Sequence, residues 1–480
     1  MNGQWLKQIR HRTGEVTEVE RTTAKKNKYE IDMCNGTIMD KLISFSLPLM
    51  LSGILQLMFN AVDIIVVGRF SGSQALAAVG STSALINVFT NLFIGISLGA
   101  NVLTARFYAA GREKEVSETV HTAITLALVS GIVMALVGLV FSKGALALMG
   151  TPDDVIGLSA LYMRIYFLGM PFFMLYNYGA AILRAVGDTK RPLLFLMIAG
   201  VINACLNMVL VIVFRLGVAG VAIATVISQM ISCVLVLRCL CRSESSYRLR
   251  FSELGMKGYY LKQIFLVGVP AGIQSTVINF SNVLLQSSVN SFGSTAMAGY
   301  TAANNLLGFL YVSVNSITQA CMSFTSQNYG VEKLKRMDRV LADCMILSVV
   351  VAVVLGCICY GFGPEILQIY TEDAEVIACG MEILAYTTIT YFLCGWMDLF
   401  PGALRGMGYS AVPMVLSVIG TVGTRVVWIF GIFPYHRSLA ILFISYPASW
   451  IITIVLQVIC FYFVRRRVHR RSQALAGQEA

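Results

Sequence analysis

An aspartate stands alone in a long apolar segment near the start of the chain. Asp63 lies in the stretch from Phe59 to Gly68, which reads FNAVDIIVVG. A charged group at the centre of a membrane costs about 2.5–3.5 kcal/mol on insertion scales, so such a residue usually has a functional reason. A carboxyl of this kind can take up a proton or coordinate a cation. The alternative is a structural role, as a protonated carboxyl bonded to a neighbouring helix or as a partly solvated residue near the segment end.

Other oxygen-bearing side chains could share a site with this carboxyl. Asn203 and Asn207 are four residues apart, so one face of a helix would carry both. Carboxylate, amide and hydroxyl oxygens suit a hard cation such as Na⁺, whereas exchange of H⁺ needs only the Asp63 carboxyl. Each asparagine could instead form hydrogen bonds between helices. We predict an ion-coupling site, with Asp63 as a possible Na⁺ ligand, formed by Asp63, Asn203, Asn207 and Thr225.

Three further amides are candidates for lining a substrate cavity. Gln56 precedes Asp63 by seven residues, Asn60 lies between them, and Asn177 falls in a later apolar segment. A second pair of charges, Asp398 and Arg425, lies in two consecutive apolar segments. We predict a structural ion pair there, because a buried pair is more often structural than a second ion site.

The segments that must position these residues are membrane spans. Of the 480 residues 57% are hydrophobic and 13% are charged, about half of the charged fraction of a soluble globular protein. A soluble enzyme, a disordered protein and a fibrous repeat are therefore excluded, and an all-α integral membrane protein is expected. Twelve apolar segments are long enough to span a bilayer: 42–67, 75–105, 120–141, 158–183, 193–214, 218–237, 264–292, 296–326, 340–362, 376–404, 412–433 and 439–464.

The basic residues predict the orientation. Most of the 36 lysines and arginines fall in the N-terminal tail, the central linker, the C-terminal tail and the even-numbered loops. By the positive-inside rule both termini are cytoplasmic, in a multi-pass protein of the cell membrane. The net charge of +11 is thus a topology signal, and no nucleic-acid partner is expected.

The two halves of the chain resemble each other. Pro48 pairs with Pro270, and Asn60 with Asn282, at an offset of 222; the motif L-R-x-x-G-x-x-x-x-P occurs at 183–192 and again at 404–413. Six spans per half is an even number, so the halves are parallel repeats that enclose a cleft between them. We expect an N-terminal tail (1–40), a first six-helix bundle (41–238), a linker (239–262), a second bundle (263–464) and a basic tail (465–480).

Several catalytic and transport motifs are missing from the sequence. It contains no G-x-x-x-x-G-K-[ST] loop, no H-E-x-x-H and no T-V-G-Y-G. An ATP-driven motor, a metalloprotease of the membrane and a potassium channel therefore lack support. We expect no enzyme and no cofactor other than a coupling ion, H⁺ or Na⁺.

The sequence resembles the multidrug and toxic compound extrusion (MATE) family, prokaryotic branch, over about residues 40–465. The resemblance rests on Pro48 with V-D-x-x-x-V-G at 62–68, on Y-x-R-I-x-x-x-G-x-P-F at 162–172, on the motif at 183–192 followed by Asn203 and Asn207, and on L-R-G-M-G at 404–408. It implies a V-shaped pair of six-helix bundles that exports organic cations and amphipathic drugs in exchange for Na⁺ or H⁺. The acid of the family falls on Asp63, and its companion polar positions fall on Gln56, Asn177, Asn203 and Thr225.

Two departures from the family pattern concern the second acid. Some relatives have an acid where this chain has Asn207, and some carry a carboxylate on the seventh span, where Gln274 and Asn279 stand here. We predict a secondary antiporter that acts as a monomer on small drug-like molecules. The alternatives are a lipid-linked oligosaccharide flippase of the same broad superfamily and a membrane sensor that does not transport.

Overall fold

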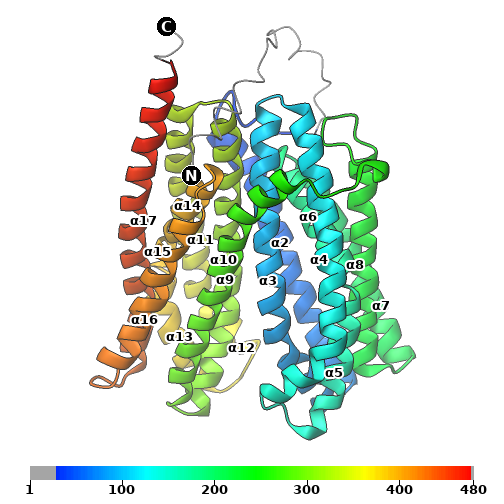
Figure 1. Cartoon of the computed structure of the whole chain (residues 1–480). Coiled ribbons are helices and arrows are strands. Elements are labelled where there is room, and N and C mark those ends of the chain that lie inside the picture. The colour runs from blue at the N-terminus through cyan, green and yellow to red at the C-terminus, as the bar shows by residue number, and fades with distance from the viewer. Residues whose placement is uncertain (1–28, 477–480) are drawn as a thin grey trace.

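Long helices run side by side through the computed structural model, which describes residues 29–476 (Figure 1). The first half of the described chain contains α2 (Met39–Phe70), α3 (Ser73–Ala109), α4 (Glu113–Leu148), α5 (Asp153–Leu168), α6 (Met170–Ala185), α7 (Lys190–Asn207), the π-helical turn η2 (Met208–Val213) and α8 (Gly217–Cys241). Helices satisfy their own backbone groups, as spans in hydrocarbon must. Most of the predicted tail, residues 1–28, lies outside the described residues.

The second half repeats this pattern. It contains α9 (Gly258–Asn290), α10 (Ser294–Gly330), α11 (Leu334–Gly361), the short α12 (Gly363–Gln368), α13 (Ala374–Thr387), α14 (Tyr391–Gly406), α15 (Ala411–Ser417), η4 (Val418–Gly423), α16 (Thr424–Val427), η5 (Trp428–Ile432) and α17 (Leu439–Ala476). Both η4 and η5 are π-helical, and together with α15 and α16 they form one continuous span over Ala411–Ile432.

The twelve predicted spans correspond to these helices. Within residues 29–476, nine helices are long and apolar enough to cross a membrane, or eleven when the bent pairs α5–α6 and α13–α14 each count as one span. The remaining long helix is α10, which has 37 residues but many buried serines, threonines and amides. The bends of 47° and 51° were not predicted. In the first, α6 begins next to Gly169 with Pro171 in its first turn, where proline starts a helix well but cannot continue the preceding one.

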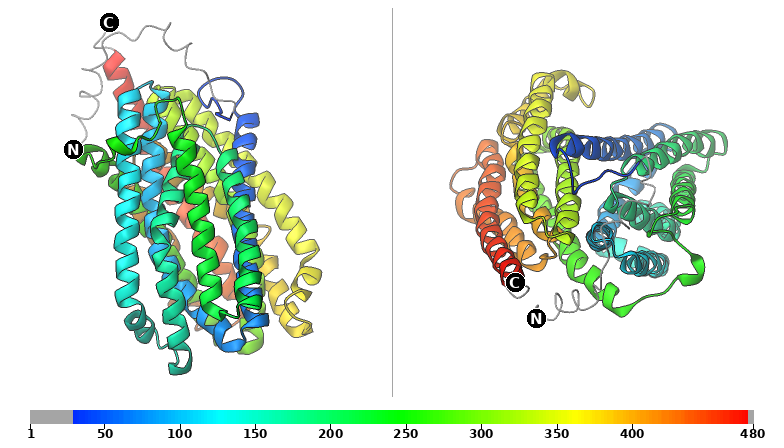
Figure 2. Two further views of the ribbon diagram at one scale, coloured as in Figure 1. Left: turned by 90° about the vertical axis from the view of Figure 1, so that its right-hand side faces the viewer. Right: turned by 90° about the horizontal axis from the view of Figure 1, so that it is seen from above.

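Two groups of helices lie side by side (Figure 1; Figure 2, right). The first group is α2–α8 and the second is α9–α17. Both described ends of the chain lie on one side of the molecule, at the top of Figure 1, which is called the terminal side below. The opposite side is called the far side.

The repeated ten-residue motif forms the same helix ending twice. α6 and α14 are each followed by a glycine with positive φ, Gly187 at 97° and Gly408 at 91°. The amide of Asp188 donates to the carbonyl of Leu183 at 2.9 Å, and that of Tyr409 donates to Leu404 at 2.9 Å. These bonds define a Schellman ending, in which glycine avoids the steric cost of the left-handed conformation.

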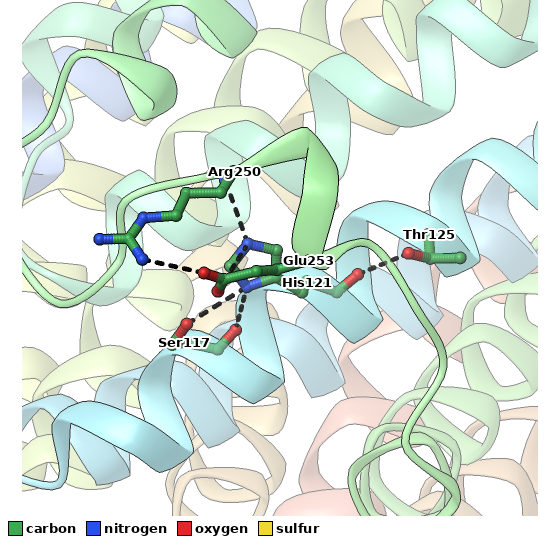
Figure 3. Close-up of polar contacts among 5 residues, drawn as sticks. All are labelled: Ser117, His121, Thr125, Arg250 and Glu253. Atoms are coloured by element: carbon green, nitrogen blue, oxygen red, sulfur yellow. Dashed lines mark hydrogen bonds and ion pairs between the residues drawn. The ribbon is translucent and has the colours of Figure 1, made fainter.

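The segment between the two groups is attached to α4 by a histidine (Figure 3). The linker, residues 242–257, includes the 3-10 turn η3 (Phe251–Glu253). Its backbone amide at Arg250 donates to Nε2 of His121 at 3.0 Å, and Nδ1 of His121 lies 2.7 Å from the Ser117 carbonyl. Because an amide can only donate, the ring accepts at Nε2 and donates from Nδ1. The hydrogen bond from Arg250 also lowers the pKa of the exposed Glu253 carboxyl below its usual range.

The two groups make close backbone contact in the terminal half of the molecule. A Cβ atom on Gly95 of α3 would come within 2.3 Å of the Gly272 backbone of α9, and one on Gly99 within 2.2 Å of the Ile264 carbonyl. Small residues allow helices in membranes to approach this closely. The side chains of Ser326 and Gln327 donate across the same interface, to the carbonyls of Val102 and Ala185. The side chains of Arg106 and Ser323 also join the two groups in this terminal half, by hydrogen bonds to the Gly406 carbonyl and to Asn101.

A segment of residues 29–38, here called the terminal strap, crosses the terminal side (Figure 2, right). At its start the Glu30 carboxylate accepts hydrogen bonds from the hydroxyls of Tyr108 and Tyr247, both at 2.7 Å. Burial raises the pKa of Tyr247, and the adjacent Glu30 carboxylate acts in the same direction, so this hydroxyl stays a donor. Further along, Lys333 and Arg336 of the second group donate to strap carbonyls. The terminal strap is therefore bonded to both groups.

We predict that Gly187→Ala destabilises the protein and that Gly408→Ala does so less. The left-handed conformation costs a non-glycine residue about 1–2 kcal/mol at either position. At Gly187 an added Cβ would also lie 2.6 Å from the Ile31 carbonyl of the terminal strap, whereas at Gly408 it meets the flexible end of Arg106 at 3.0 Å. The unfolding temperatures of the purified variants in detergent show which of the two is less stable.

The matched control is Gly144→Ala in α4, where no atom lies within 4 Å of the added Cβ and φ is not positive. That change should be neutral or stabilising, because alanine favours helix over glycine by up to about 1 kcal/mol. Equal unfolding temperatures for the Gly187 and Gly144 variants would contradict the assigned role of the helix ending.

Candidate functional site

Three helices of the first group meet at Asp63. This residue lies in the last two turns of α2, toward the far side, and is partly buried. The amide nitrogen of Asn207, at the end of α7, donates a short hydrogen bond to Oδ1 of Asp63. The hydroxyl of Thr225 in α8 lies 3.4 Å from Oδ2. Residues separated by more than 140 positions in the sequence thus contact one carboxyl group.

Asn203 completes the polar cluster. The Nδ2 of Asn207 also donates to Oδ1 of Asn203 at 3.1 Å, as their four-residue spacing on α7 allows. Asn203 is 5% exposed and Asn207 is fully buried. All four residues predicted for ion coupling are therefore brought together by the structure. Their role in binding an ion stays a prediction.

Close packing of α7 on α2 sets this geometry. Phe59 lies directly over Gly200, where an added Cβ would come within 1.8 Å of the Phe59 ring. One turn beyond Gly200 the chain reaches Asn203, and after Asn207 the helix widens into the π-helical turn η2. Such π-helical turns are frequent at functional sites because they redirect side chains locally.

The Asp63 carboxyl has only neutral partners. Within residues 29–476 no Lys, Arg or His side chain lies at ion-pair distance from it. The phenols of Tyr162 and Tyr166 in α5 also interact with it electrostatically, and their rings stack at 6.1 Å from each other. Sequence analysis did not assign these tyrosines to the site, although they lie within or beside one of the motifs that carry the family resemblance.

The hydrogen bonding of the site is incomplete. Thr225 has one hydroxyl hydrogen, and its oxygen lies 3.0 Å from the Val221 carbonyl but 3.4 Å from Asp63. The hydrogen therefore favours Val221, which leaves Oδ2 of Asp63 weakly bonded. In the same cluster, Oδ1 of Asn207 is buried with no hydrogen-bond partner in the described chain. A cation or a proton brought to this point would find carboxylate and amide oxygens with free lone pairs.

Of the three residues predicted to line the substrate cavity, two lie on the same helix as Asp63 and one does not. Gln56 and Asn60 are exposed on α2, at positions i and i+4, and Asp63 follows at i+7 on the same helix face. Asn177 of α6 is partly buried, and its amide donates to the Phe173 carbonyl of its own helix at 2.8 Å. The structure thus places two of the three beside the carboxyl on α2 and does not bring Asn177 into its hydrogen-bond network.

The predicted ion pair between Asp398 and Arg425 is not formed. The cation that acts electrostatically on Asp398 is Arg405, two turns further along the same helix α14, and Arg405 donates to Gln274 at 2.6 Å. Arg425 instead donates to Ser281 and Asn282 of α9. Neighbouring spans in sequence need not present these two faces to each other, and here Arg425 points to α9.

The fold and the site define a class of protein: a multi-pass membrane protein of two repeated helix groups, with an unpaired carboxyl among neutral oxygens inside the first. Comparison with known proteins identifies the family. The MatE family model matches residues 48–209 and 270–430, one stretch in each half of the chain. The chain belongs to the MatE family, the multidrug and toxic compound extrusion transporters.

Individual relatives cover most of both chains. The chain is 32% identical over 434 residues to the probable multidrug resistance protein YoeA of Bacillus subtilis, covering 88% of this chain and 93% of that protein. It is 22% identical over 382 residues to the multidrug export protein MepA of Staphylococcus aureus, covering 79% and 84%. The fold also matches a solved outward-facing multidrug resistance MATE family transporter with a TM-score of 0.84 and 19% identity, covering 94% of this chain and all of that chain.

We predict that Asn207→Ala lowers the stability of the protein by about 1–3 kcal/mol. The change removes the donor to Asp63 and leaves a buried carboxyl oxygen without its hydrogen bond. Asn177→Ala is the matched control, because that amide bonds only a carbonyl of its own helix. Thermal unfolding in detergent should show a clearly larger loss for Asn207→Ala; a larger loss for Asn177→Ala would mean that the network around Asp63 is not what stabilises this part of the fold.

Proposed function

We propose that this protein is a secondary antiporter that exports organic cations and amphipathic drugs across the cell membrane in exchange for H⁺ or Na⁺. A single chain performs the exchange, with a first bundle of residues 41–238 and a second of residues 263–464. Asp63 is the residue that takes up the coupling ion. Asn203, Asn207 and Thr225 help to hold it, and Gln56 and Asn60 contact the substrate beside it.

The observation that carries this proposal is the unpaired carboxyl of Asp63. A carboxyl used only for structure would be expected to have a basic partner or a full set of hydrogen bonds. This one has neutral partners and a weakly bonded oxygen, and an unpartnered amide oxygen lies next to it. The site is thus suited to a small cation that arrives and leaves, which is what ion coupling requires.

Either coupling ion fits these atoms. Na⁺ would take oxygen ligands from the Asp63 carboxylate, the Asn207 and Asn203 amides and the Thr225 hydroxyl. With H⁺ as the coupling ion, the protonated Asp63 would donate its new O–H to the free Oδ1 of Asn207 after rotation of that amide. Both modes require movement of Asn207, because its nitrogen now faces the carboxyl.

The arrangement of the two groups supports an outward-facing state. The interface of α3 with α9 and the terminal strap close the terminal side. With both termini cytoplasmic, as the positive-inside rule predicts, the closed side is the cytoplasmic one and Asp63 lies in the outer half. Ion binding there favours a form that releases the drug, and by linkage the drug weakens ion binding by the same factor.

The printed names of the relatives support the substrate class. YoeA is described as a probable multidrug resistance protein and MepA as a multidrug export protein. Family members with these names share most of their length with this chain. We infer export of several chemically different drugs rather than of one metabolite.

We predict that Asp63→Asn abolishes gradient-driven export while the protein still inserts and folds. Asparagine keeps the size of the side chain but cannot take up a proton, and it binds Na⁺ more weakly than a carboxylate. The measurement is drug flux in proteoliposomes under an imposed Na⁺ or H⁺ gradient, with an expected loss of at least roughly tenfold, in the range of typical coupling free energies. The gradient that drives the wild-type protein identifies the coupling ion.

Asp154→Asn is the matched control, the same chemical change at an exposed position in the first turn of α5. It should retain wild-type flux. Retained export in Asp63→Asn would refute Asp63 as the coupling residue. Absence of gradient-driven flux in the wild-type protein would favour a flippase or a sensor that does not transport.

A further inference from the structure

Arg425 is a buried cation of the second group that has no carboxylate partner. Its side chain is 3% exposed, and no ion pair to it exists within residues 29–476. Its Nη1 donates to Asn282 Oδ1 at 2.7 Å and to Ser281 Oγ at 3.2 Å. Burying a charge without a counter-charge is costly, and two neutral oxygens compensate it only in part. The hydrogen bonds between α16 and α9 alone therefore do not explain why an arginine stands at position 425.

Arg425 and the side chains around it carry more donor hydrogens than there are acceptor lone pairs nearby to receive them. Its Nε is buried with no partner in the described chain. The guanidinium carbon lies 4.6 Å from the centre of the Tyr446 ring, and the Tyr446 hydroxyl is 2.9 Å from the Tyr300 hydroxyl. One of these hydroxyls donates to the other, so one hydrogen of the pair remains. A set of donors around a positive charge binds an anion, as carboxylates bind to arginine.

The backbone at this position is also specialised. Arg425 lies in α16, a four-residue helical segment between the π-helical turns η4 and η5. The equivalent span of the first group, α7 with η2, also widens into a π-helical turn just after the asparagines that serve Asp63. Widened turns recur where helices carry function, so both repeats share this feature at the level of their charged site.

The internal repeat gives the two sites opposite charge. At the offset of 222, Asn60 corresponds to Asn282, which binds Arg425, whereas Asp63 corresponds to the apolar Leu285. At the offset of 221, Ala204 corresponds to Arg425 itself. A carboxyl without a cation occupies the first group, and a guanidinium without an anion occupies the equivalent region of the second.

We propose that Arg425, together with the hydroxyls of Tyr300 and Tyr446, forms a binding subsite for a singly charged anionic group. This inference rests on the proposed export function, which it deepens by naming the residues that would hold the carboxylate of a cargo molecule with both an amine and a carboxylate. The same chemistry would hold a free halide ion. The carboxylate replaces the missing counter-charge of Arg425, accepts from Nε and takes the spare tyrosine hydrogen.

The transport experiment compares a zwitterionic fluoroquinolone with its ethyl ester, which lacks the carboxylate. Purified wild-type protein, Arg425→Gln and Tyr300→Phe are assayed in proteoliposomes. Arg425→Gln should lower the apparent affinity for the acid relative to the ester by about tenfold, as expected for loss of a hydrogen bond to a charged group. Tyr300→Phe should lower the same ratio by a smaller factor. Arg164→Gln, at an exposed arginine within α5, is the control and should leave the ratio unchanged.

An equal loss for acid and ester in Arg425→Gln and an unchanged ratio in Tyr300→Phe would overturn the subsite and leave Arg425 as a structural tie. If Arg425→Gln does not fold, Tyr300→Phe decides alone, since it removes one hydroxyl and keeps the ring. Wild-type transport of the ester shows whether the export function itself holds. The failure of that function is thereby distinguished from failure of the subsite.

The second arm needs no transport and separates the two sources of the anion. The unfolding temperature of the purified protein is measured in sodium gluconate, in sodium chloride, and in gluconate with the acid or the ester. If chloride raises the unfolding temperature of the wild-type protein but not that of Arg425→Gln, the subsite binds a free halide. If the acid raises the unfolding temperature more than the ester does, and this difference is absent in Arg425→Gln, the subsite binds the carboxylate of the substrate. No rise with either anion overturns the subsite.

Discussion

The carboxyl of Asp63, held in an apolar helix by neutral hydrogen-bond donors, is the constraint around which the first group of helices is built. An ionised group in a low-dielectric interior interacts strongly with any cation that reaches it, because little water screens the charge. The same environment makes the empty carboxylate expensive. If a coupling ion binds here as proposed, it changes the free energy of the protein by far more than an equivalent event at the surface, and the helices that touch the site are the ones that would respond.

α2 is the element that can transmit this response. Its far end carries Asp63 and contacts α7 and α8 through Asn207 and Thr225. Nearer the terminal side, Gly53 of the same helix packs so closely on Val312 of α10 that an added Cβ would come within 2.0 Å of the valine side chain. Under the proposed mechanism, a tilt of α2 on ion binding would therefore act on the second group. For the terminal side to open, the terminal strap would have to release either the two tyrosines or the basic residues that hold it. These hydrogen bonds would therefore add to the free energy needed to reach the state that is open on the terminal side.

The helices could be predicted from the sequence more fully than the side-chain contacts between them. The apolar segments and the repeated motif follow from length, spacing and the helical period, because each helix in a membrane must hide one set of residues from lipid. The grouping of Asp63 with Asn203, Asn207 and Thr225 was expected from the chemistry of their oxygens and from the family resemblance; the helical period placed only the two asparagines on one face. The ion pair of Asp398 with Arg425 is not formed because adjacency in sequence does not fix the rotation of one helix against the next; Arg425 bonds to α9, and the cation that acts on Asp398 is Arg405. The role of Asn177 in a substrate cavity stays a prediction; its amide bonds the carbonyl four residues earlier on its own helix and does not join the network around Asp63. The bends at α5–α6 and α13–α14 depend on local breaks within segments that read as continuous by hydropathy.

The two repeats share a backbone and differ in charge, and this difference has a consequence for exchange. Two carboxyl sites would compete for the same cation and repel each other. Under the two proposals above, one carboxyl in the first group and one guanidinium in the second would attract opposite ends of a dipolar molecule between them, and the attraction would fall when a cation occupies Asp63. Coupling then needs no direct displacement at the atoms of the ion site, because the change in charge of the first group alone weakens the hold on the amine end of the cargo. On this view the repeat supplies the symmetric motion, and the asymmetry of Asp63 and Arg425 supplies its selectivity.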